Sequence, residues 1–270
     1  MKGVILAGGT GSRLYPLTKV SNKHLLPVGD KPMIQHCVEK LTEADIYDIL
    51  VVTGGDHIGH IAEFLGSGAQ FGCSITYKIQ EEAGGIAQAL GLAKGFVREG
   101  ESMCVILGDN LFQDDLRNIV YKFERMPESG NAMVVLKEVD DPDRFGVANL
   151  EPCVDGVIYR DLPASRIFKD AGICGIGDLR LRISSIEEKP TEPKSNYAVT
   201  GVYFYEYGVF DLVDGLEPSG RGELEITDVN NAYLLRGKLC YDLFDGWWTD
   251  AGTHESYQRA NRLVSGCAIE

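Results

Sequence analysis

A glycine-rich turn followed by two cations provides the first residues whose types and spacing could do chemistry. The apolar run Gly3–Ala7 leads directly into Gly8-Gly9-Thr10-Gly11-Ser12-Arg13, and Lys23 follows. Small residues after a strand let backbone N–H groups approach a phosphate chain. An arginine can form paired hydrogen bonds with phosphate oxygens, and a lysine can act as a point charge. The turn completes neither G-x-G-x-x-G nor a Walker loop, so a simple tight turn is the alternative.

Charge is unevenly distributed along the chain. Its 270 residues carry 26 Lys and Arg against 40 Asp and Glu, a formal net charge of −14, yet residues 1–32 hold five cations and one acid. An acidic chain lacks the basic surface of a duplex nucleic-acid binder, and no apolar run approaches the ~18 residues of a membrane-spanning helix. We therefore expect no nucleic-acid or membrane partner and, without a visible secretion signal, a cytoplasmic protein. The cationic N-terminal segment favours a polyphosphate ligand.

Alternating strand and helix patterns position these residues. The predicted strands of the first half are Gly3–Ala7, Asp48–Thr53, Cys73–Ile79 and Ser102–Leu107, and the predicted helices are Met33–Glu43, His57–Leu65 and Ile86–Val97. Such alternation predicts an α/β fold with a mainly parallel sheet flanked by helices, and with ligands bound beyond the carboxyl ends of the strands. The later predicted elements are strands Ala132–Glu138, Arg182–Glu188 and Thr200–Tyr205 and helices Ile226–Leu235 and Glu255–Val264.

The chain shows no boundary between domains and no metal or redox motif. No linker or repeat divides it, which predicts a single domain over residues 1–270 with a small substrate-side lobe. The seven cysteines are widely scattered and form no C-x-x-C pair, so we interpret them as reduced thiols. His57 and His60 could ligate a metal, but a solvated helix start is the preferred interpretation.

Motifs along nearly the whole chain resemble one enzyme family. The segments Leu6–Leu14 and Asn22–Pro27 are similar to those of the sugar-1-phosphate nucleotidylyltransferases, and most similar to those of the glucose-1-phosphate thymidylyltransferases. Further matches are Gly84–Ala89, Leu107–Asn110, Phe145–Val147, Glu187–Pro190, Tyr197–Gly201, Arg221–Asp228 and Trp248–Thr253. One such motif could arise by chance, but seven in family order indicate membership. The resemblance implies a nucleotidyltransferase fold, with a Rossmann-like mixed, mainly parallel sheet flanked by helices.

The resemblance also implies a Mg²⁺-dependent reaction. A sugar-1-phosphate oxygen would attack the α-phosphorus of a nucleoside triphosphate and release pyrophosphate. The implied substrates are dTTP and glucose 1-phosphate, and the product dTDP-glucose would begin a route toward dTDP-rhamnose or related deoxysugars. A phosphate monoester has a second pKa of ~6, so its oxygen is already ionised at neutral pH and needs no general base. The absence of a Ser/His/Asp or Cys/His arrangement from the sequence is consistent with this chemistry.

Residue roles follow from the resemblance only where this sequence matches the family. The implied catalytic residues are Arg13, Lys23, Asp109 and Asp250, of which the two aspartates would form the magnesium pair. The implied nucleotide-binding residues are Leu6, Gly8, Gly9, Thr10, Gly11, Arg13, Lys23, Gln80, Gly85 and Asp109, and the implied sugar-phosphate residues are Asn110, Gly146, Glu188, Lys189, Val199 and Tyr203. Residues 1–131 would bind mainly the nucleotide and residues 132–270 mainly the sugar phosphate. A homo-oligomer, specifically a tetramer, is also implied.

Several alternatives stay open. The Gln80 amide fits a thymine or uracil edge but could flip toward cytosine, so a UTP-dependent or other sugar-1-phosphate nucleotidylyltransferase is the alternative function. A non-catalytic regulatory subunit that binds nucleotide sugars is the remote one. Glu188 and Lys189 can share a pocket only if their strand twists or ends there, which Pro190 favours. An insertion around residues 152–181 is expected to be a surface loop or hairpin extension, or else a lid or subunit contact.

Overall fold

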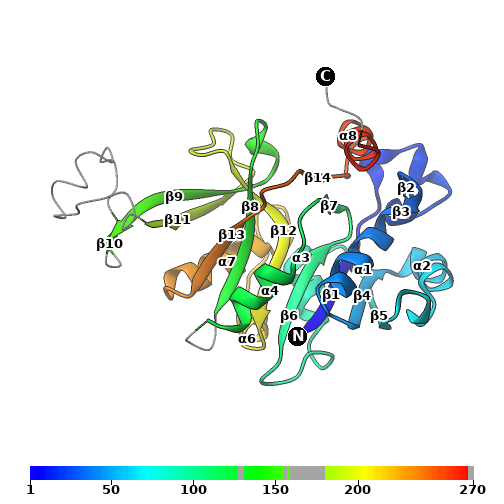
Figure 1. Ribbon diagram of the computed structural model, residues 1–270, viewed down its shortest axis with the longest axis horizontal. Coiled ribbons are helices and arrows are strands. Elements are labelled where there is room, and N and C mark those ends of the chain that lie inside the picture. The colour runs from blue at the N-terminus through cyan, green and yellow to red at the C-terminus, as the bar shows by residue number, and fades with distance from the viewer. Residues whose placement is uncertain (127–130, 155–156, 159–179, 267–270) are drawn as a thin grey trace.

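The computed structural model describes residues 1–126, 131–154, 157–158 and 180–266, and ten strands of this part form one mixed sheet (Figure 1). Its parallel part consists, in spatial order, of β6 (Ser102–Leu107), β1 (Lys2–Ala7), β4 (Asp48–Gly54) and β5 (Ser74–Gln80). Beyond β6 the sheet continues through β12 (Tyr197–Glu206) to β8 (Ala132–Glu138), β9 (Gly146–Val154), β10 (Val157–Ile158), β11 (Arg180–Glu188) and β13 (Leu239–Leu243). The predicted mixed sheet is confirmed.

The strand order creates a switch point between β1 and β6. From β1 the chain moves outward through β4 and β5, and then returns to the opposite side of β1 at β6. Open α/β sheets bind ligands beyond the carboxyl ends of the strands at such a reversal. The glycine turn follows β1 and Asp109 follows β6. The fold therefore brings the predicted phosphate-binding and metal-binding segments to the same edge of the sheet.

Both faces of β1 are apolar, which is why helices cover the sheet on both sides. Ile5 and Ala7 belong to one buried cluster, and Val4 and Leu6 to another. The helices on the first face are α1 (Met33–Glu43), α2 (Ile58–Leu65) and α4 (Arg117–Glu124), and those on the second are α3 (Ile86–Gly91), α6 (Val209–Val213) and α7 (Ile226–Leu235). A third cluster joins α8 (His254–Val264) to the hairpin of β2 (Pro27–Val28) and β3 (Lys31–Pro32).

Strands β9 and β11 form a long antiparallel ribbon that extends away from the rest of the sheet (Figure 1). Gly146 pairs with Glu188 at its base, and Cys153 pairs with Arg180 toward its far end. The insertion expected around residues 152–181 begins and ends in this ribbon, but residues 155–156 and 159–179 lie outside the described part of the chain. Its expected role stays a prediction.

The structure differs from the predicted elements where the spacing of apolar residues does not define the ends or the type of an element. The predicted helix over Ile86–Val97 ends at Gly91, and the chain continues in turns past Gly95, whose φ of +87° suits glycine. The sequence pattern also gave no prediction for α4, β9 or β13. Glycine, asparagine, glutamate and proline in β9 obscure its alternation, and α4 spans only two turns.

Among the described side chains, those of Cys37, Cys104, Cys240 and His60 lie outside the predicted site. Cys37 and Cys104 are free and buried, and Cys240 is free and exposed. His60 lies exposed on α2. Within the described ranges, no group of three or more His, Cys, Asp or Glu side chains is arranged to hold a metal. None of the helices that the structure describes is long and apolar enough to cross a membrane.

Gly201 offers a test of how β12 is shaped around the site. The pairing of β12 with β8 shifts between Val199 and Tyr203, and Gly201 has a φ of +72°. A Cβ atom at Gly201 would lie 2.9 Å from Leu107 Cδ1. We expect Gly201→Ala to lower the free energy of unfolding by about 2–4 kcal/mol, because backbone strain adds to overpacking.

Gly208→Ala is the matched control, since Gly208 has a φ of −58° and a Cβ atom there would meet nothing within 4 Å. We expect its free energy of unfolding to change by less than about 1 kcal/mol. Urea denaturation followed by circular dichroism measures both variants. Equal stabilities would contradict the strain at Gly201.

Candidate active site

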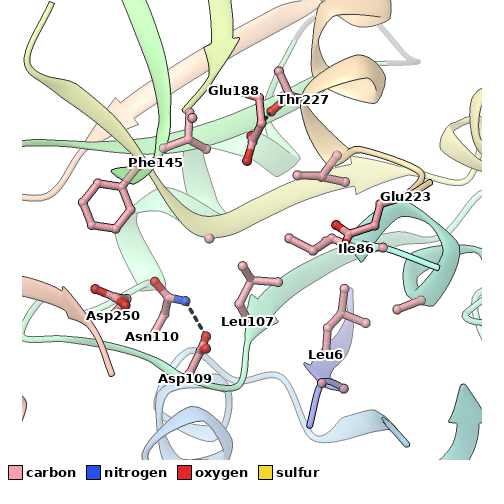
Figure 2. A pocket seen from close by; sticks show the side chains of 18 of the residues that line it. Leu6, Ile86, Leu107, Asp109, Asn110, Phe145, Glu188, Glu223, Thr227 and Asp250 are labelled. Atoms are coloured by element: carbon pink, nitrogen blue, oxygen red, sulfur yellow. Dashed lines mark hydrogen bonds between the residues drawn. The ribbon is translucent and has the colours of Figure 1, made fainter. Parts of the chain in front are cut away.

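Most of the sequence-predicted site residues line one cavity of about 600 Å³ (Figure 2). They are Leu6, Gly8, Gly9, Arg13, Lys23, Gln80, Gly85, Asp109, Asn110, Gly146, Glu188, Lys189, Val199, Tyr203 and Asp250. Thr10 and Gly11 belong to the same glycine turn but are not among the lining residues. In Figure 2, Asp109, Asn110 and Asp250 lie together on one side, and Glu188 and Thr227 lie across the cavity from them.

A short two-stranded ladder brings Asp109 and Asp250 together. Strand β7 (Asn110–Phe112) pairs antiparallel with β14 (Trp248–Asp250), so that Asp250 lies opposite Asn110. The backbone N–H of Ala251 also donates to the Asp109 carbonyl oxygen at 2.8 Å. Two carboxylates that are far apart in the sequence are therefore held by backbone hydrogen bonds at the same edge of the cavity.

Each of these carboxylates has its own cationic partner. Lys23 Nζ lies 2.5 Å from Asp109 Oδ2, and Arg144 Nη2 lies 3.0 Å from Asp250 Oδ1. Burial raises the pKa of the Asp109 carboxyl, but the positive charges of Lys23 and His24 and the hydrogen bond from Lys23 outweigh burial. The net effect is a pKa well below the usual range, so Asp109 is ionised at neutral pH.

Hydrogen bonds from buried side chains fix the orientation of Asp109. Its Oδ1 accepts from Asn110 Nδ2 at 3.0 Å, and Asn110 Oδ1 accepts from Trp248 Nε1 at 3.0 Å. The same Trp248 N–H also donates to the Thr200 carbonyl oxygen at 3.0 Å. The Trp248 ring packs edge-on against Phe145, with ring centroids 4.9 Å apart. Strand β12 is thereby tied to the carboxylate pair.

Gly252 shows how closely the charged groups converge. A Cβ atom at this position would lie 3.2 Å from Asp250 Oδ2, 3.4 Å from Arg13 Nη2 and 3.5 Å from Asp109 Oδ2. The Gly252 N–H donates to Asp250 Oδ2 at 3.1 Å. Both carboxylates and the Arg13 guanidinium therefore surround one small volume, which a larger residue at position 252 would begin to fill.

Glu188 and Lys189 both line the cavity because strand β11 ends at Glu188. Lys189 has a φ of +43°, and its backbone N–H donates to the Phe145 carbonyl oxygen at 2.9 Å. A left-handed residue breaks the extended geometry in which neighbouring side chains face opposite sides. Thr227 Oγ1 donates to Glu188 Oε2 at 2.7 Å and orients its carboxylate. The expectation that the strand ends here is confirmed.

The cavity also contains residues that the sequence did not assign to the site. They are Ala83, Ile86, Ala89, Leu107, Arg144, Phe145, Gly201, Glu223, Ile226, Thr227 and Trp248. Most lie within the motifs of the family resemblance, so those motifs already indicated that these segments contribute to the site. Arg144 directly precedes the Phe145–Val147 motif, and its charge beside that motif is the signal that could have found it. Its pairing with Asp250 becomes apparent only in the fold.

His24 lies behind the site and is not among the cavity-lining residues. It is 1% exposed, and its Nδ1 lies 2.8 Å from Asn22 Oδ1. Its ring packs beneath Gly108, where a Cβ atom would lie 2.9 Å from His24 Cδ2. His24 therefore supports the backbone just before Asp109, and the glycine allows this close approach.

Fold and site together define a nucleotidyl transferase, and the chain belongs to that family, whose model matches residues 2–265. A glucose-1-phosphate thymidylyltransferase from Neisseria meningitidis serogroup A is 39% identical over 266 residues, which cover 98% of this chain and 82% of that protein. A crystal structure of a candidate glucose-1-phosphate thymidylyltransferase from Bacillus anthracis, in complex with a sucrose, has a TM-score of 0.83 at 53% identity and covers 100% of this chain and 96% of its own. A UDP-glucose pyrophosphorylase complexed with UDP-glucose has a TM-score of 0.79 at 23% identity over 99% of each chain, which shows the shared fold alone.

The Trp248 hydrogen bonds give a test of how the carboxylate pair is supported. Trp248→Phe keeps an aromatic ring beside Phe145 but removes the donor to Asn110 Oδ1 and to the Thr200 carbonyl oxygen. Leaving buried acceptors unpaired is expected to lower the free energy of unfolding by about 1–3 kcal/mol, as measured by urea denaturation. Trp247→Phe is the control, since Trp247 is only partly buried and we expect a smaller loss there. A loss at Trp247 as large as that at Trp248 would contradict the support role.

Proposed function

We propose that this chain is a glucose-1-phosphate thymidylyltransferase. It would transfer the thymidylyl group of dTTP to α-D-glucose 1-phosphate and give dTDP-glucose and pyrophosphate, a first step toward dTDP-rhamnose or related deoxysugars. The observation that carries this proposal is the convergence of Arg13, Lys23, Asp109 and Asp250 at one side of a cavity whose other side holds Glu188 and Lys189. The name of the Neisseria meningitidis relative supports the choice of substrates.

The glycine turn and its cations are assigned to the triphosphate. Gly8, Gly9, Arg13 and Lys23 line the cavity beyond β1. Backbone N–H groups and a guanidinium suit phosphate oxygens, and they stabilise the negative charge that grows on the α-phosphate and the leaving pyrophosphate. Lys23 is paired with Asp109, which places its ammonium group beside the same volume.

The donor set of the carboxylate pair fits Mg²⁺. Two carboxylates surround one small volume together with Arg13, and Mg²⁺ characteristically takes one or two carboxylates and completes its shell with phosphate and water oxygens. Asp109 and Asp250 are therefore assigned as its ligands. When bound, the ion would neutralise charge on the phosphate oxygens. Asn110 and Trp248 hold Asp109 in place, and Arg144 and Gly252 hold Asp250.

The opposite side of the cavity is assigned to the sugar phosphate. Lys189 supplies a cation for its phosphate, and Glu188, oriented by Thr227, can accept hydrogen bonds from sugar hydroxyls. Gly146, Val199 and Tyr203 shape the surrounding pocket. The attacking phosphate oxygen is already ionised at neutral pH, so positioning and charge stabilisation supply the rate without a general base. The family resemblance also carries the proposal of a homotetramer.

The proposed substrates are tested by measuring pyrophosphate release across a matrix of dTTP, UTP, dCTP, ATP and GTP with several sugar 1-phosphates. We expect the highest kcat/KM for dTTP with glucose 1-phosphate. A higher value for UTP would support the UTP-dependent alternative, and no release with any pair would contradict nucleotidyl transfer by this chain.

The carboxylate pair is tested with Asp109→Asn and Asp250→Asn. Each variant keeps the size of the side chain but removes one negative charge from the proposed Mg²⁺ site, so we expect kcat/KM to fall at least about 100-fold. Pyrophosphate release measures the loss, and circular dichroism confirms folding. Asp30→Asn makes the same charge change at an exposed position and should leave the rate unchanged. Near-normal activity in both site variants would refute the assignment.

A further inference from the structure

Two glutamine amides behind the glycine segment 84–85 form a hydrogen-bonded chain whose polarity is fixed at both ends. Gln88 Oε1 accepts from the Gly84 backbone N–H at 3.1 Å and from Gln80 Nε2 at 2.8 Å. Gln80 Nε2 also donates to the Gly85 carbonyl oxygen at 3.1 Å. A backbone N–H can only donate and a carbonyl oxygen can only accept. The Gln88 atom in this chain must therefore be its oxygen, and the Gln80 atom must be its nitrogen.

This arrangement leaves one kind of group on Gln80 for a ligand. Its amide nitrogen is engaged by Gln88 and Gly85, so its oxygen is the atom available to the cavity, which Gln80 lines. That oxygen lies against Gly8, where a Cβ atom would be 2.7 Å away. Turning the amide over would set its oxygen against the Gln88 oxygen and the Gly85 carbonyl oxygen. Two hydrogen bonds would become two repulsive contacts.

The backbone around these amides is fixed tightly enough to hold the orientation. The Leu224 N–H donates to the Gly84 carbonyl oxygen at 2.8 Å, and the Ala87 N–H donates to the Leu224 carbonyl oxygen at 3.1 Å. Gly85 has a φ of +99°, and a Cβ atom there would lie 2.5 Å from the Leu224 carbonyl oxygen. A Cβ atom at Gly84 would lie 2.2 Å from Gln88 Nε2. Gly84 is therefore required for Gln88 to pack where it does, and Gly85 for the close approach of Leu224.

We propose that Gln88 is a positioning residue that sets base selectivity by locking the Gln80 amide with its oxygen toward the base. N3 of thymine and of uracil carries a hydrogen and can donate to that oxygen, whereas N3 of cytosine carries a lone pair and would be repelled. An amide free to turn would accept either edge. The locked amide therefore selects bases with an N3–H and rejects cytosine. This inference deepens the proposed function and rests on it, because it takes the substrate to be a pyrimidine nucleotide.

Gln88 itself is not among the cavity-lining residues, so its effect must pass through Gln80. Gln88→Glu keeps an acceptor for the Gly84 N–H and for Gln80 Nε2, and should preserve the orientation. Gln88→Met has a similar length but offers no such acceptor. Among the described residues it leaves the Gly85 carbonyl oxygen as the one acceptor for Gln80 Nε2, so the Gln80 amide should turn more readily. Comparing the two variants thus separates the effect of the Gln88 hydrogen bonds from the effect of side-chain size.

The test is calorimetric binding of dTTP and of dCTP, without sugar phosphate, to the wild type and both variants. We expect the wild type to bind dTTP at least about tenfold more tightly than dCTP, since a fixed acceptor rejects a base that lacks the matching donor. Gln88→Glu should retain this ratio, and Gln88→Met should lower it at least about threefold, because one of the two acceptors that orient the Gln80 amide is lost. A wild-type ratio retained in Gln88→Met would overturn the proposal, and so would an equal loss of affinity for both nucleotides, which indicates only structural damage.

Failure of this inference is distinguishable from failure of the proposed function. Nucleotide binding needs no turnover, and pyrophosphate release by the wild type with dTTP and glucose 1-phosphate is measured separately. Release with dTTP but no selectivity against dCTP would overturn the role of Gln88 and leave the transferase proposal standing. If Gln88→Met is poorly folded by circular dichroism, Gln88→Ala provides the second acceptor-free variant, and retention of the wild-type ratio there would overturn the proposal equally.

Discussion

The site depends on holding two negative charges side by side. Like charges in a partly buried cavity repel, and an uncompensated carboxylate there would be protonated or displaced. Lys23 and Arg144 each neutralise one member of the pair, at 2.5 Å from Asp109 and 3.0 Å from Asp250. The pairing of β7 with β14 keeps the backbones together, and the Gly252 N–H adds a donor to Asp250. The backbone pairing and the two cations together allow both carboxylates to lie at this edge of the sheet.

The same pairing of cations with carboxylates suits the cavity to phosphate chemistry. In the proposed reaction Asp109 and Asp250 would hold a cation that neutralises phosphate charge, and Lys23 and Arg144 supply further positive charge beside them. Charge would then be redistributed among groups already in place, and little reorganisation would be needed as the transition state forms. The negative overall charge of the protein does not oppose this, because two of the five cations among the N-terminal 32 residues, Arg13 and Lys23, line the cavity.

Features set by neighbouring residues, such as strands and the turns that follow them, could be predicted from the sequence. Contacts that require pairing between separate segments of the chain could not. The glycine turn after β1 and Asp109 after β6 were predictable, because parallel strands end at one edge. The roles of both Asp109 and Asp250 were assigned through the family resemblance, and no local spacing indicates that β14 pairs with β7 and brings the two together. The Arg144–Asp250 ion pair had no sequence signal, because it joins residues 106 positions apart. The Gln80–Gln88 hydrogen bond had none either, because it depends on how the glycine turn between β5 and α3 folds.

The shared cation site of Asp109 and Asp250 is tested most directly by Mn²⁺ titration in the presence of a dTTP analogue with a non-hydrolysable α,β bridge. The electron paramagnetic resonance signal of free Mn²⁺ reports how much ion is bound, independently of turnover. We expect the wild type with the analogue to bind Mn²⁺ at least about tenfold more tightly than Asp250→Asn with the same analogue. Equal Mn²⁺ affinity in the two proteins would contradict a site built from both carboxylates.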